Sequence, residues 1–467
     1  MDIDTDYLIV GAGTAGLAFA DSLLAESDVE VVLVDRRQDP GGHWRDAYPF
    51  IRLHSPSAYY GVNSMPLGRD QLIESGRNKG FYEQASAAEI CAYFERVLGD
   101  RLEPTGRAQL LGRHDHLGGN GNEHRIRDLR SGDVHTVRVR RRVVDATYQE
   151  TSVPATHTPS FTVSPDASFV PINALPDVAE SYRRFTVVGS GKTSVDACLW
   201  LLDHDVAADQ IRWVRPRDMW FQDRAALQPL DQVAQIMEGI AWDAEAAAQA
   251  SDPSDMFERL EASGRLMRID QSVWPTMFRA TMLSQPELAE LRGIEDVVRL
   301  GRVRAIDSDR IVLDQGEVPT SAEVLHVDCS AIGLRDSPAV PIFDAGQIVL
   351  QQVRYGSPSF NAALLGFIEA QDASDEEKNQ LSPPHPHPSS VDDWGPMTRM
   401  TWLAEMVWSK DPKVASWVAS SRLNLMQALP DHLDEPRAQE ALSRYLTNVG
   451  AAIERLSTPA VGGHDTM

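Results

Sequence analysis

The chain of 467 residues has little cysteine and no long apolar run. Its three cysteines, Cys91, Cys198 and Cys329, lie far apart and form no C-x-x-C pair, which argues against a zinc knuckle or a dithiol redox site. No apolar stretch approaches the length needed to span a bilayer. The N-terminal residues are acidic and lead directly into an apolar strand, so we expect no signal peptide. The sequence therefore predicts a cytoplasmic protein with reduced thiols, no membrane association and no bound metal.

The chain also lacks an excess of positive charge. Lysine and arginine together number 44 against 68 aspartate and glutamate residues, and the net charge is −24. Nucleic acids and anionic membranes require clustered lysine and arginine, so neither is expected as a standing partner. A hydrophobic share of 42% and a charged share of 24% are ordinary for a globular protein, and the length suggests two or three domains.

A glycine-rich turn stands near the start of the chain. An apolar strand over residues 7–10 leads into GAGTAG at residues 11–16, and a helical pattern leads to a second apolar strand, residues 29–35, which ends in Asp35. Strand, glycine turn, helix, strand and acid in this order are the context of a dinucleotide-binding site, with the acid on a ribose hydroxyl. The alternative is an α/β turn without a nucleotide. The residues predicted to contact the dinucleotide are Gly11, Gly13, Thr14, Ala15, Gly16, Asp35 and Arg36.

The next segment, residues 39–64, indicates that this dinucleotide is FAD. Two adjacent glycines leave the backbone bare beside a flat cofactor, and a histidine and a tryptophan follow them. The Gly-Gly-x-Trp pattern of residues 41–44 and the Tyr-Pro-x-x-Arg pattern of residues 48–52 resemble the flavin-containing monooxygenases and their Baeyer–Villiger relatives. The resemblance implies that FAD is contacted by Gly42, His43, Trp44, Arg52 and His54.

Two residues of this segment are predicted to be catalytic. His54 stands where the Baeyer–Villiger relatives carry an aspartate, a departure that weighs against a Baeyer–Villiger reaction. Asn63-Ser64 resembles the Asn-Ser pair of the flavin-containing monooxygenases, whose asparagine sits at the reactive edge of the flavin. We therefore predict that Asn63 hydrogen-bonds the oxygen adduct of the flavin and that His54 has a polar or acid–base role. The alternatives are a packed loop histidine and an ordinary turn residue.

A second glycine motif repeats the first design with a different charge. Residues 185–202 contain an apolar strand, the turn GSGKTS and an amphipathic helix, and a strand over residues 211–214 runs into two arginines. A guanidinium pairs with the 2′-phosphate that an acid would repel, so the pattern predicts NADPH rather than NADH. The alternative is that the arginines are surface residues. An ATPase is excluded because the phosphate-loop spacing is missing. The predicted contacts are Gly189, Ser190, Gly191, Lys192, Thr193, Ser194, Arg215 and Arg217.

Three further segments are predicted to connect the two units. Residues 124–150 suggest a hairpin with a turn at residues 131–133, followed by a crossing strand that brings Ala146 to the cofactor. The families named above continue with Phe-x-Gly-x-x-x-His, whereas this chain has Pro171 and Leu175 in place of the glycine and histidine, so it is a divergent relative. Residues 323–334 resemble the strand that returns to the FAD domain, which places Gly333 near the pyrophosphate.

The remaining segments are predicted from their composition. Residues 219–295 have helical spacing and suggest a helical insertion. Residues 356–370 predict a helix capped by Ser359, with Phe360 and Asn361 near the isoalloxazine, or else an ordinary amphipathic helix. Residues 372–395, with His385 and His387, are rich in proline and acid and predict an exposed loop, and helices follow from Thr398 to about Leu456. Disorder is predicted from Thr458 onward.

Together these patterns predict an α/β protein with two Rossmann-like domains of the glutathione-reductase type. Residues 1–150 and 326–467 form the FAD domain, and residues 151–325 form an inserted NADPH domain carrying the insertion of about 219–295. The predicted function is an NADPH-consuming FAD monooxygenase that transfers one oxygen atom from a C4a-(hydro)peroxyflavin to a small organic substrate, with dioxygen as co-substrate and N- or S-oxygenation favoured. The alternatives are an NAD(P)H-dependent flavin oxidoreductase and a non-catalytic redox sensor. A homodimer is left open.

Overall fold

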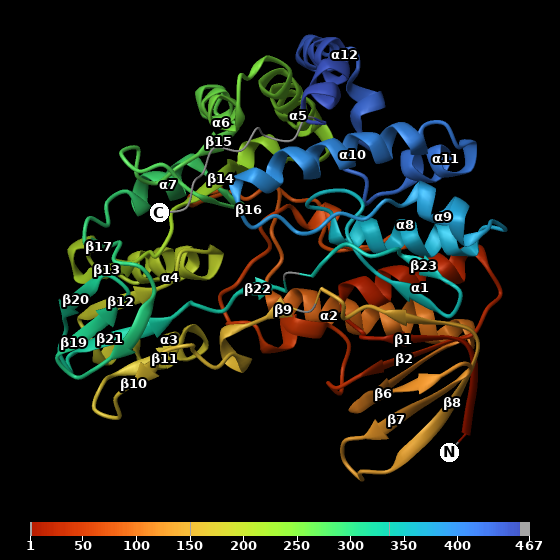
Figure 1. The fold of residues 1–467 in the computed structure, drawn as a ribbon, viewed down its shortest axis with the longest axis horizontal. Coiled ribbons are helices and arrows are strands. Elements are labelled where there is room, and N and C mark those ends of the chain that lie inside the picture. The colour runs from red at the N-terminus through yellow and green to blue at the C-terminus, as the bar shows by residue number, and fades with distance from the viewer. Residues whose placement is uncertain (1, 150, 336, 458–467) are drawn as a thin grey trace.

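A computed structural model describes residues 2–149, 151–335 and 337–457. The segment predicted to be disordered lies outside these residues. In Figure 1 the two sheets of the predicted dinucleotide-binding units stand side by side, and helices from the insertion and the C-terminal region lie across their upper ends. No helix in the described ranges is long and apolar enough to cross a membrane.

The first unit is built on an eight-stranded sheet. Its main path runs β23-β24-β8-β1-β2-β5, with all neighbours parallel except the β23–β24 pair, and β6 and β7 extend it as an antiparallel ribbon beside β8. The predicted hairpin is confirmed by the pairing of β7 with β8. The strands are β1 (Asp2–Val10), β2 (Val31–Asp35), β5 (Ala108–Gly112), β6 (His114–Asn120), β7 (Glu123–Asp128), β8 (Val134–Asp145), β23 (Phe343–Asp344) and β24 (Gln347–Val349).

Two helices that are far apart in the sequence pack together on one face of this sheet. They are α1 (Thr14–Glu26) and α8 (Pro358–Ala370), and both are buried along nearly their whole length because each lies between the sheet and other helices. A Cβ atom on Gly366 would come 2.4 Å from the carbonyl oxygen of Phe19, so the close approach requires glycine. Helix α2 (Ala87–Val97) begins at a capping box and packs into the same core.

The second unit has its own parallel sheet, in the order β11-β21-β12-β13-β17. A four-stranded sheet, β10-β18-β19-β20, packs beside it, and helix α4 (Lys192–Asp203) follows β12. Pro171 ends the edge strand β11, where the missing N–H is tolerated. Two parallel sheets, each with a glycine turn, confirm the predicted fold class. The strands are β10 (Thr162–Val163), β11 (Phe169–Pro171), β12 (Arg184–Val188), β13 (Ile211–Val214), β17 (Val297–Val298), β18 (Val303–Ile306), β19 (Arg310–Leu313), β20 (Gly316–Pro319) and β21 (Val324–Asp328).

Short elements complete the connections. The two-stranded ribbon of β9 (Thr151–Ser152) and β22 (Gly333–Leu334) joins the outgoing and returning chain between the units. A second small ribbon pairs β3 (Gly61–Val62) with β4 (Met65–Pro66). The one-turn helix α3 (Leu175–Val178) leads into β12.

The insertion over residues 219–295 is only partly helical, so the prediction of a helical insertion was wrong in part. It contains helices α5 (Val233–Gln249), α6 (Pro253–Ala262) and α7 (Gln285–Leu291), and also a three-stranded sheet. The apolar strand sequences are buried on both faces, and such runs cannot be told from helix by periodicity. The strands are β14 (Met219–Asp223), β15 (Leu266–Met267) and β16 (Met277–Leu283).

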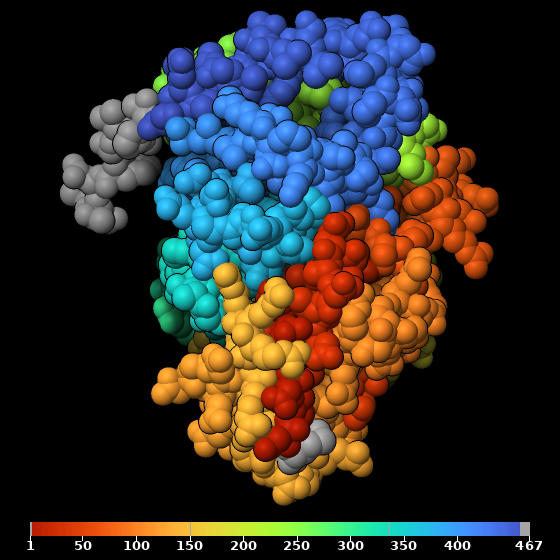
Figure 2. Space-filling view, turned by 90° about the vertical axis from the view of Figure 1, so that its right-hand side faces the viewer, coloured from red at the N-terminus to blue at the C-terminus, as the bar shows by residue number. Residues whose placement is uncertain are grey.

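The C-terminal region is helical, as predicted, and lies over the first unit (Figure 2). Residues 372–395 are not a simple exposed loop, because they contain α9 and the buried side chain of His385. The predicted cap at Ser359 was also wrong: α8 begins at Pro358 after Ser357, and the Ser359 hydroxyl accepts a hydrogen bond from the Gly61 N–H. The helices are α9 (Asp375–Leu381), α10 (Trp394–Trp408), α11 (Pro412–Ser420) and α12 (Pro436–Arg455).

Candidate cofactor and active site

The first glycine turn joins the carboxyl end of β1 to the start of α1. Gly11 has φ +104°, a conformation that favours glycine, and a Cβ atom on Gly16 would come 2.0 Å from the Gly11 oxygen. Gly13 is the N-cap of α1, and no described side chain caps this helix, so its first N–H groups face an anion-binding position. Ala146 closes the turn from β8, where its N–H donates to the Val10 oxygen over 3.0 Å.

The predicted FAD contacts gather around this turn. A Cβ atom on Gly42 would come 3.0 Å from the Gly13 Cα, so two bare backbone segments lie against each other. Asp35 is buried at the end of β2 and accepts hydrogen bonds from the N–H groups of Ala12 and Arg37, each over 2.8 Å. These residues fit a dinucleotide: bare backbone and an uncapped helix for the pyrophosphate, and a carboxylate beside them for a ribose. The neighbouring Arg36 side chain is directed to Asp115 instead, over 2.8 Å.

Tyr60 connects three segments of the chain that lie around the predicted cofactor site. Its hydroxyl accepts a hydrogen bond from the Trp44 indole N–H over 2.6 Å and lies 2.5 Å from the Thr14 hydroxyl. Burial lowers the pKa of the adjacent His43 to about 4, and the charge of Arg37 adds to this, so the imidazole is neutral. Tyr60 was not predicted, and no sequence pattern marks it, because its partners come from separate segments of the chain.

The second glycine turn has the same construction. Gly189 has φ +141°, and a Cβ atom there would come 2.4 Å from the Cys329 oxygen. Gly191 is the N-cap of α4, again without a cap from any described side chain. Ser194 occupies the third position, buried, with its hydroxyl donating to the Gly191 oxygen over 2.8 Å. The turn fits a second pyrophosphate.

The two arginines after β13 have different surroundings. Arg215 is 4% exposed, lies over the Trp213 ring and pairs with Asp218 at 3.3 Å. Arg217 is exposed beside the glycine turn, where its backbone N–H donates to the Ser190 hydroxyl over 3.5 Å and its guanidinium lies 3.6 Å from the Met277 sulfur. Arg217 is therefore better placed for a ribose 2′-phosphate, whereas Arg215 is held by the protein. Both assignments stay predictions.

The segment from Asp46 to His54 runs from the first glycine turn to the second. The Tyr48 hydroxyl donates to Asp196 of α4 over 2.6 Å, and Asp196 also binds Lys192 of the GSGKTS turn. Phe50 stacks on Trp200 of the same helix. The Lys192–Asp196 spacing of four residues on a helix is a sequence signal for this ion pair.

His54 lies where this segment meets the insertion. Its carbonyl oxygen accepts hydrogen bonds from Arg224 over 2.5 Å and from Gln84 over 2.9 Å, and its Nδ1 lies 3.4 Å from the Met282 N–H. Burial holds the pKa of His54 well below its usual range, and the charges of Lys192 and Arg224 add to this. The imidazole is thus neutral and stands between the two units.

Asn63 is not brought close to His54 by any contact in the described ranges. It lies in the turn between β3 and β4, and its side-chain oxygen accepts from the Ser421 hydroxyl over 2.9 Å. Ser64 is bound by Asp21, seven residues along α1 from Thr14, which is about 10 Å from the helix start. The catalytic role of Asn63 stays a prediction, and its position gives it a structural role as well.

The other residues that were predicted to contact the flavin also form contacts within the protein. The Asn361 amide exchanges two hydrogen bonds with the Arg354 backbone, over 2.9 and 2.8 Å. Phe360 is buried among Trp408, Trp417 and the Arg354 guanidinium. Gly333, with φ +78°, lies in the β9–β22 ribbon between the units.

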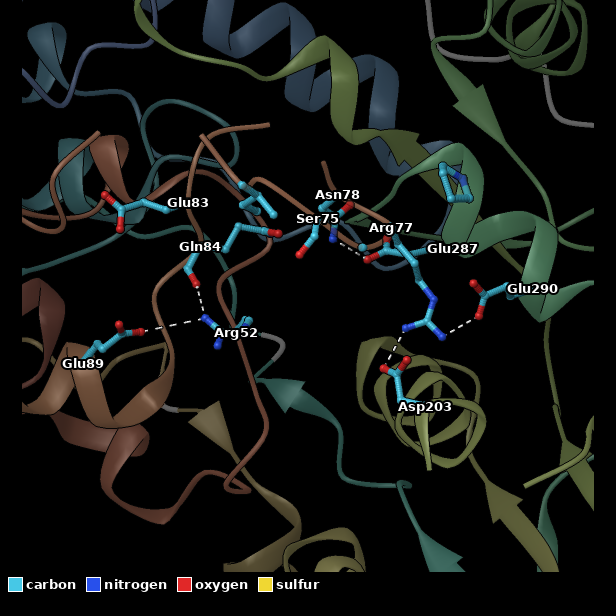
Figure 3. A pocket seen from close by; sticks show the side chains of 13 residues that line it. Arg52, Ser75, Arg77, Asn78, Glu83, Gln84, Glu89, Asp203, Glu287 and Glu290 are labelled. Atoms are coloured by element: carbon cyan, nitrogen blue, oxygen red, sulfur yellow. Dashed lines mark hydrogen bonds and ion pairs between the residues drawn. The ribbon is translucent and has the colours of Figure 1, made fainter. Parts of the chain in front are cut away.

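A cavity of about 850 Å³ opens between the first unit and α4 and α7 of the second (Figure 3). Figure 3 shows Arg77 reaching across to Asp203 and Glu290, while Arg52 binds the Gln84 carbonyl and faces Glu89. The lining carries five carboxylates and two guanidinium groups, and one of the carboxylates, Glu287, is paired with Arg224 over 2.9 Å. The remaining excess of carboxylates favours a positively charged guest. The lining residues are Arg52, Ile73, Ser75, Gly76, Arg77, Asn78, Glu83, Gln84, Glu89, Asp203, Pro286, Glu287 and Glu290.

The fold and the two turns define a protein with paired dinucleotide-binding units, and comparison with known proteins adds a family. Residues 9–66 match the model of the NAD(P)-binding Rossmann-like domain, which confirms the first predicted unit. The chain is 43% identical over 458 residues to the uncharacterized protein Rv2000 of Mycobacterium tuberculosis, covering 97% of this chain and 84% of that protein. The chain belongs to the same family as Rv2000.

Two further comparisons concern monooxygenases. A stretch of 102 residues is 30% identical to the probable FAD-binding monooxygenase AlmA of an Acinetobacter species, covering 21% of this chain and 18% of that protein. This match agrees with the resemblance predicted from the sequence. The structure of cyclohexanone monooxygenase from Rhodococcus sp. Phi1 bound to NADP+ is similar with a TM-score of 0.46 and 12% identity, covering 98% of this chain and 97% of that one.

Proposed function

We propose that the protein is an FAD-dependent, NADPH-consuming monooxygenase acting on a small organic substrate, with N- or S-oxygenation favoured. The observation that carries the proposal is the continuous segment from Gly42 to His54, which links the glycine turn of one unit to helix α4 of the other. A nicotinamide held at the second turn would thereby approach a flavin held at the first. We assign FAD to residues 1–150 and 326–467, and NADPH to residues 151–325.

Different residues would bind and orient each of the two cofactors. Bound FAD would accept hydride from NADPH and activate dioxygen. The α1 and α4 N-termini would hold the two pyrophosphates, Asp35 a ribose of FAD, and Arg217 the 2′-phosphate of NADPH. Neutral His54 accepts from the Met282 N–H at Nδ1 and therefore carries its proton on Nε2, from which it could donate a hydrogen bond near the junction. Burial around the junction would exclude water from the reaction.

The acidic cavity supports an amine as the substrate. With Glu287 paired to Arg224, its lining still has two more carboxylates than guanidinium groups, and it is of the size that holds a small organic ligand. It adjoins Gln84, which binds the His54 carbonyl. A cation entering here would therefore be drawn toward the junction of the two units.

Product analysis tests the reaction. The purified protein, reconstituted with FAD, is supplied with NADPH, dioxygen and a panel of tertiary amines and thioethers, and NADPH loss, peroxide and oxygenated product are measured together. We expect one oxygenated product per NADPH with at least one amine. Stoichiometric peroxide without product would favour the flavin oxidoreductase alternative, and a protein that binds no FAD would exclude both.

A variant tests the assignment of Asn63 separately. If Asn63 is catalytic, Asn63→Ala should raise the ratio of peroxide to oxygenated product while NADPH oxidation continues. Ser421→Ala is the matched control, because it removes the same hydrogen bond from the other side. Equal effects of the two variants would mean that Asn63 acts only by holding the turn.

A further inference from the structure

Two buried side chains lie opposite each other just beyond β24. Gln352 and His385 form an isolated antiparallel bridge, in which the backbone N–H of His385 donates to the backbone carbonyl oxygen of Gln352 over 3.0 Å. The Gln352 side chain is 7% exposed and that of His385 is 2% exposed. Residues directly opposite in such a pair direct their side chains to the same side, so the two polar groups share one environment.

The hydrogen bonds that these two side chains make show which of their atoms are left without a partner. The His385 Nδ1 donates to the Pro386 oxygen over 3.0 Å, so its Nε2 carries a lone pair. The Gln352 amide nitrogen donates to the Nδ1 of His387 over 3.1 Å, which leaves the amide oxygen as an acceptor. Burial lowers the pKa of His385, so this ring is neutral. Neither the His385 Nε2 nor the Gln352 Oε1 has a partner in the described part of the chain.

The place of this pair in the fold suggests what the partner is. Gln352 lies between the carboxyl end of β24 and the N-terminus of α8, and the Leu350 N–H donates to the Asp145 oxygen at the end of β8 over 3.0 Å. The Gly11 turn leaves the same edge of the same sheet, and α1 and α8 are neighbours. A cofactor lying along this edge from the α1 N-terminus reaches the loop of Gln352.

We propose that Gln352 and His385 accept hydrogen bonds from N–H or O–H donors of the flavin part of bound FAD. The inference rests on the proposed function, since it takes FAD as the occupant of the first unit. Flavin and its ribityl chain carry both kinds of donor. Two adjacent buried acceptors without donors are uncommon in folded proteins, and a ligand that supplies both donors would account for them. A structural water is the other source of the same chemistry.

An adjacent residue provides a matched control. Gln351 is also buried, but its amide oxygen accepts from the Val340 N–H over 3.0 Å and its amide nitrogen donates to the Val340 oxygen over 2.8 Å. Gln351→Met therefore removes only satisfied hydrogen bonds, whereas Gln352→Met and His385→Phe each remove an unsatisfied acceptor together with one hydrogen bond to the protein. The full-length variants are stripped of FAD and titrated with it by fluorescence quenching, and thermal unfolding is recorded with and without FAD.

The inference predicts different responses in the two glutamine variants. Gln352→Met and His385→Phe should each weaken FAD binding by about tenfold. Each should lower the melting temperature of the FAD-free protein less than Gln351→Met does, because each loses one hydrogen bond to the protein rather than two. Gln351→Met should lower that melting temperature and leave FAD affinity within about twofold of wild type. If a variant does not fold, Gln352→Asn, which keeps the amide but withdraws it by one methylene, should show the same loss of FAD affinity.

Three results would contradict parts of this account separately. If Gln352→Met lowers the melting temperature without changing FAD affinity, the acceptors serve a structural water and the inference is wrong. If Gln351→Met weakens FAD binding as much as Gln352→Met, the effect is a general loss of the loop and the inference is again wrong. If the wild-type protein binds no FAD, the proposed function fails first.

Discussion

The two glycine turns share a backbone design but differ in the space that they leave for a side chain at the third position of the motif. At the first turn the third position must be Gly16, because any Cβ atom would collide with the Gly11 oxygen. At the second turn the same position is Ser194, whose side chain fits and hydrogen-bonds within the turn. The first turn is also covered by Trp44 and Tyr60. We infer that the first unit is built to retain its nucleotide and the second to exchange it.

The largest effect is expected when the third position of each turn is substituted, because the two turns should then respond differently. Gly16→Ala should cost about 3 kcal/mol or more of unfolding free energy and abolish FAD retention, because the backbone of the turn must move. Ser194→Ala should cost about 1 kcal/mol, since only one hydrogen bond is lost. Chemical denaturation and the flavin-to-protein absorbance ratio measure both. Similar losses in the two variants would show that the turns are equally demanding.

The second prediction concerns the charge that follows each turn, which is an aspartate in the first unit and two arginines in the second. Arg217→Ala should raise the KM for NADPH by about 10- to 100-fold and leave that for NADH nearly unchanged, because a charge-assisted contact to the 2′-phosphate is lost. Arg215→Ala should affect both nucleotides alike, because this arginine is buried against Asp218. Steady-state kinetics with each nucleotide checks this. A selective effect of Arg215→Ala alone would reverse the assignment.

The third prediction concerns the joint between the units. Tyr48→Phe should destabilise the protein by about 1–2 kcal/mol, because the hydroxyl donates to the Asp196 carboxylate in a buried position. A double-mutant cycle with Asp196→Ala, which removes the acceptor, isolates this interaction. Additive effects of the two substitutions would mean that the hydrogen bond does not hold the units together.

The smallest expected effect is a pH dependence from the first unit. The pKa of His43 is about 4 in the folded protein, below its unfolded value, so the unfolded chain takes up the proton first as the pH falls. Stability should therefore decrease from about pH 6.5 to pH 4. His43→Gln should flatten this slope in the melting temperature, whereas the exposed His204→Gln should not. An unchanged slope in His43→Gln would assign the effect to other groups.

The sequence predicted what depends on local spacing. The glycine turns, Asp35 and the β7–β8 hairpin are short-range patterns, and the structure places them as expected. The strands of the insertion were missed because a doubly buried apolar run has no diagnostic period. Helix α9 was missed although its capping box, Ser374 and Glu377, is visible in the sequence. The different burial of Arg215 and Arg217 could not be predicted, because it depends on tertiary packing.

Arg422 gives the molecule a particular order of assembly. Its guanidinium donates to the backbone oxygens of Ala58, Tyr60, Val62 and Met65, next to the segment that covers the first glycine turn. These partners are separated by some 360 residues of chain. At about 5–20 residues per second, a ribosome needs roughly 20–70 seconds between the two.

During that interval the nascent N-terminal unit lacks this arginine, β24 and α8, so the edge of β8 and the face of α1 that packs on α8 remain uncovered. The packing of this unit is therefore completed only when the C-terminal part of the chain has been made. Slower translation or a lower growth temperature should therefore affect the yield of flavin-loaded protein more than its catalytic properties.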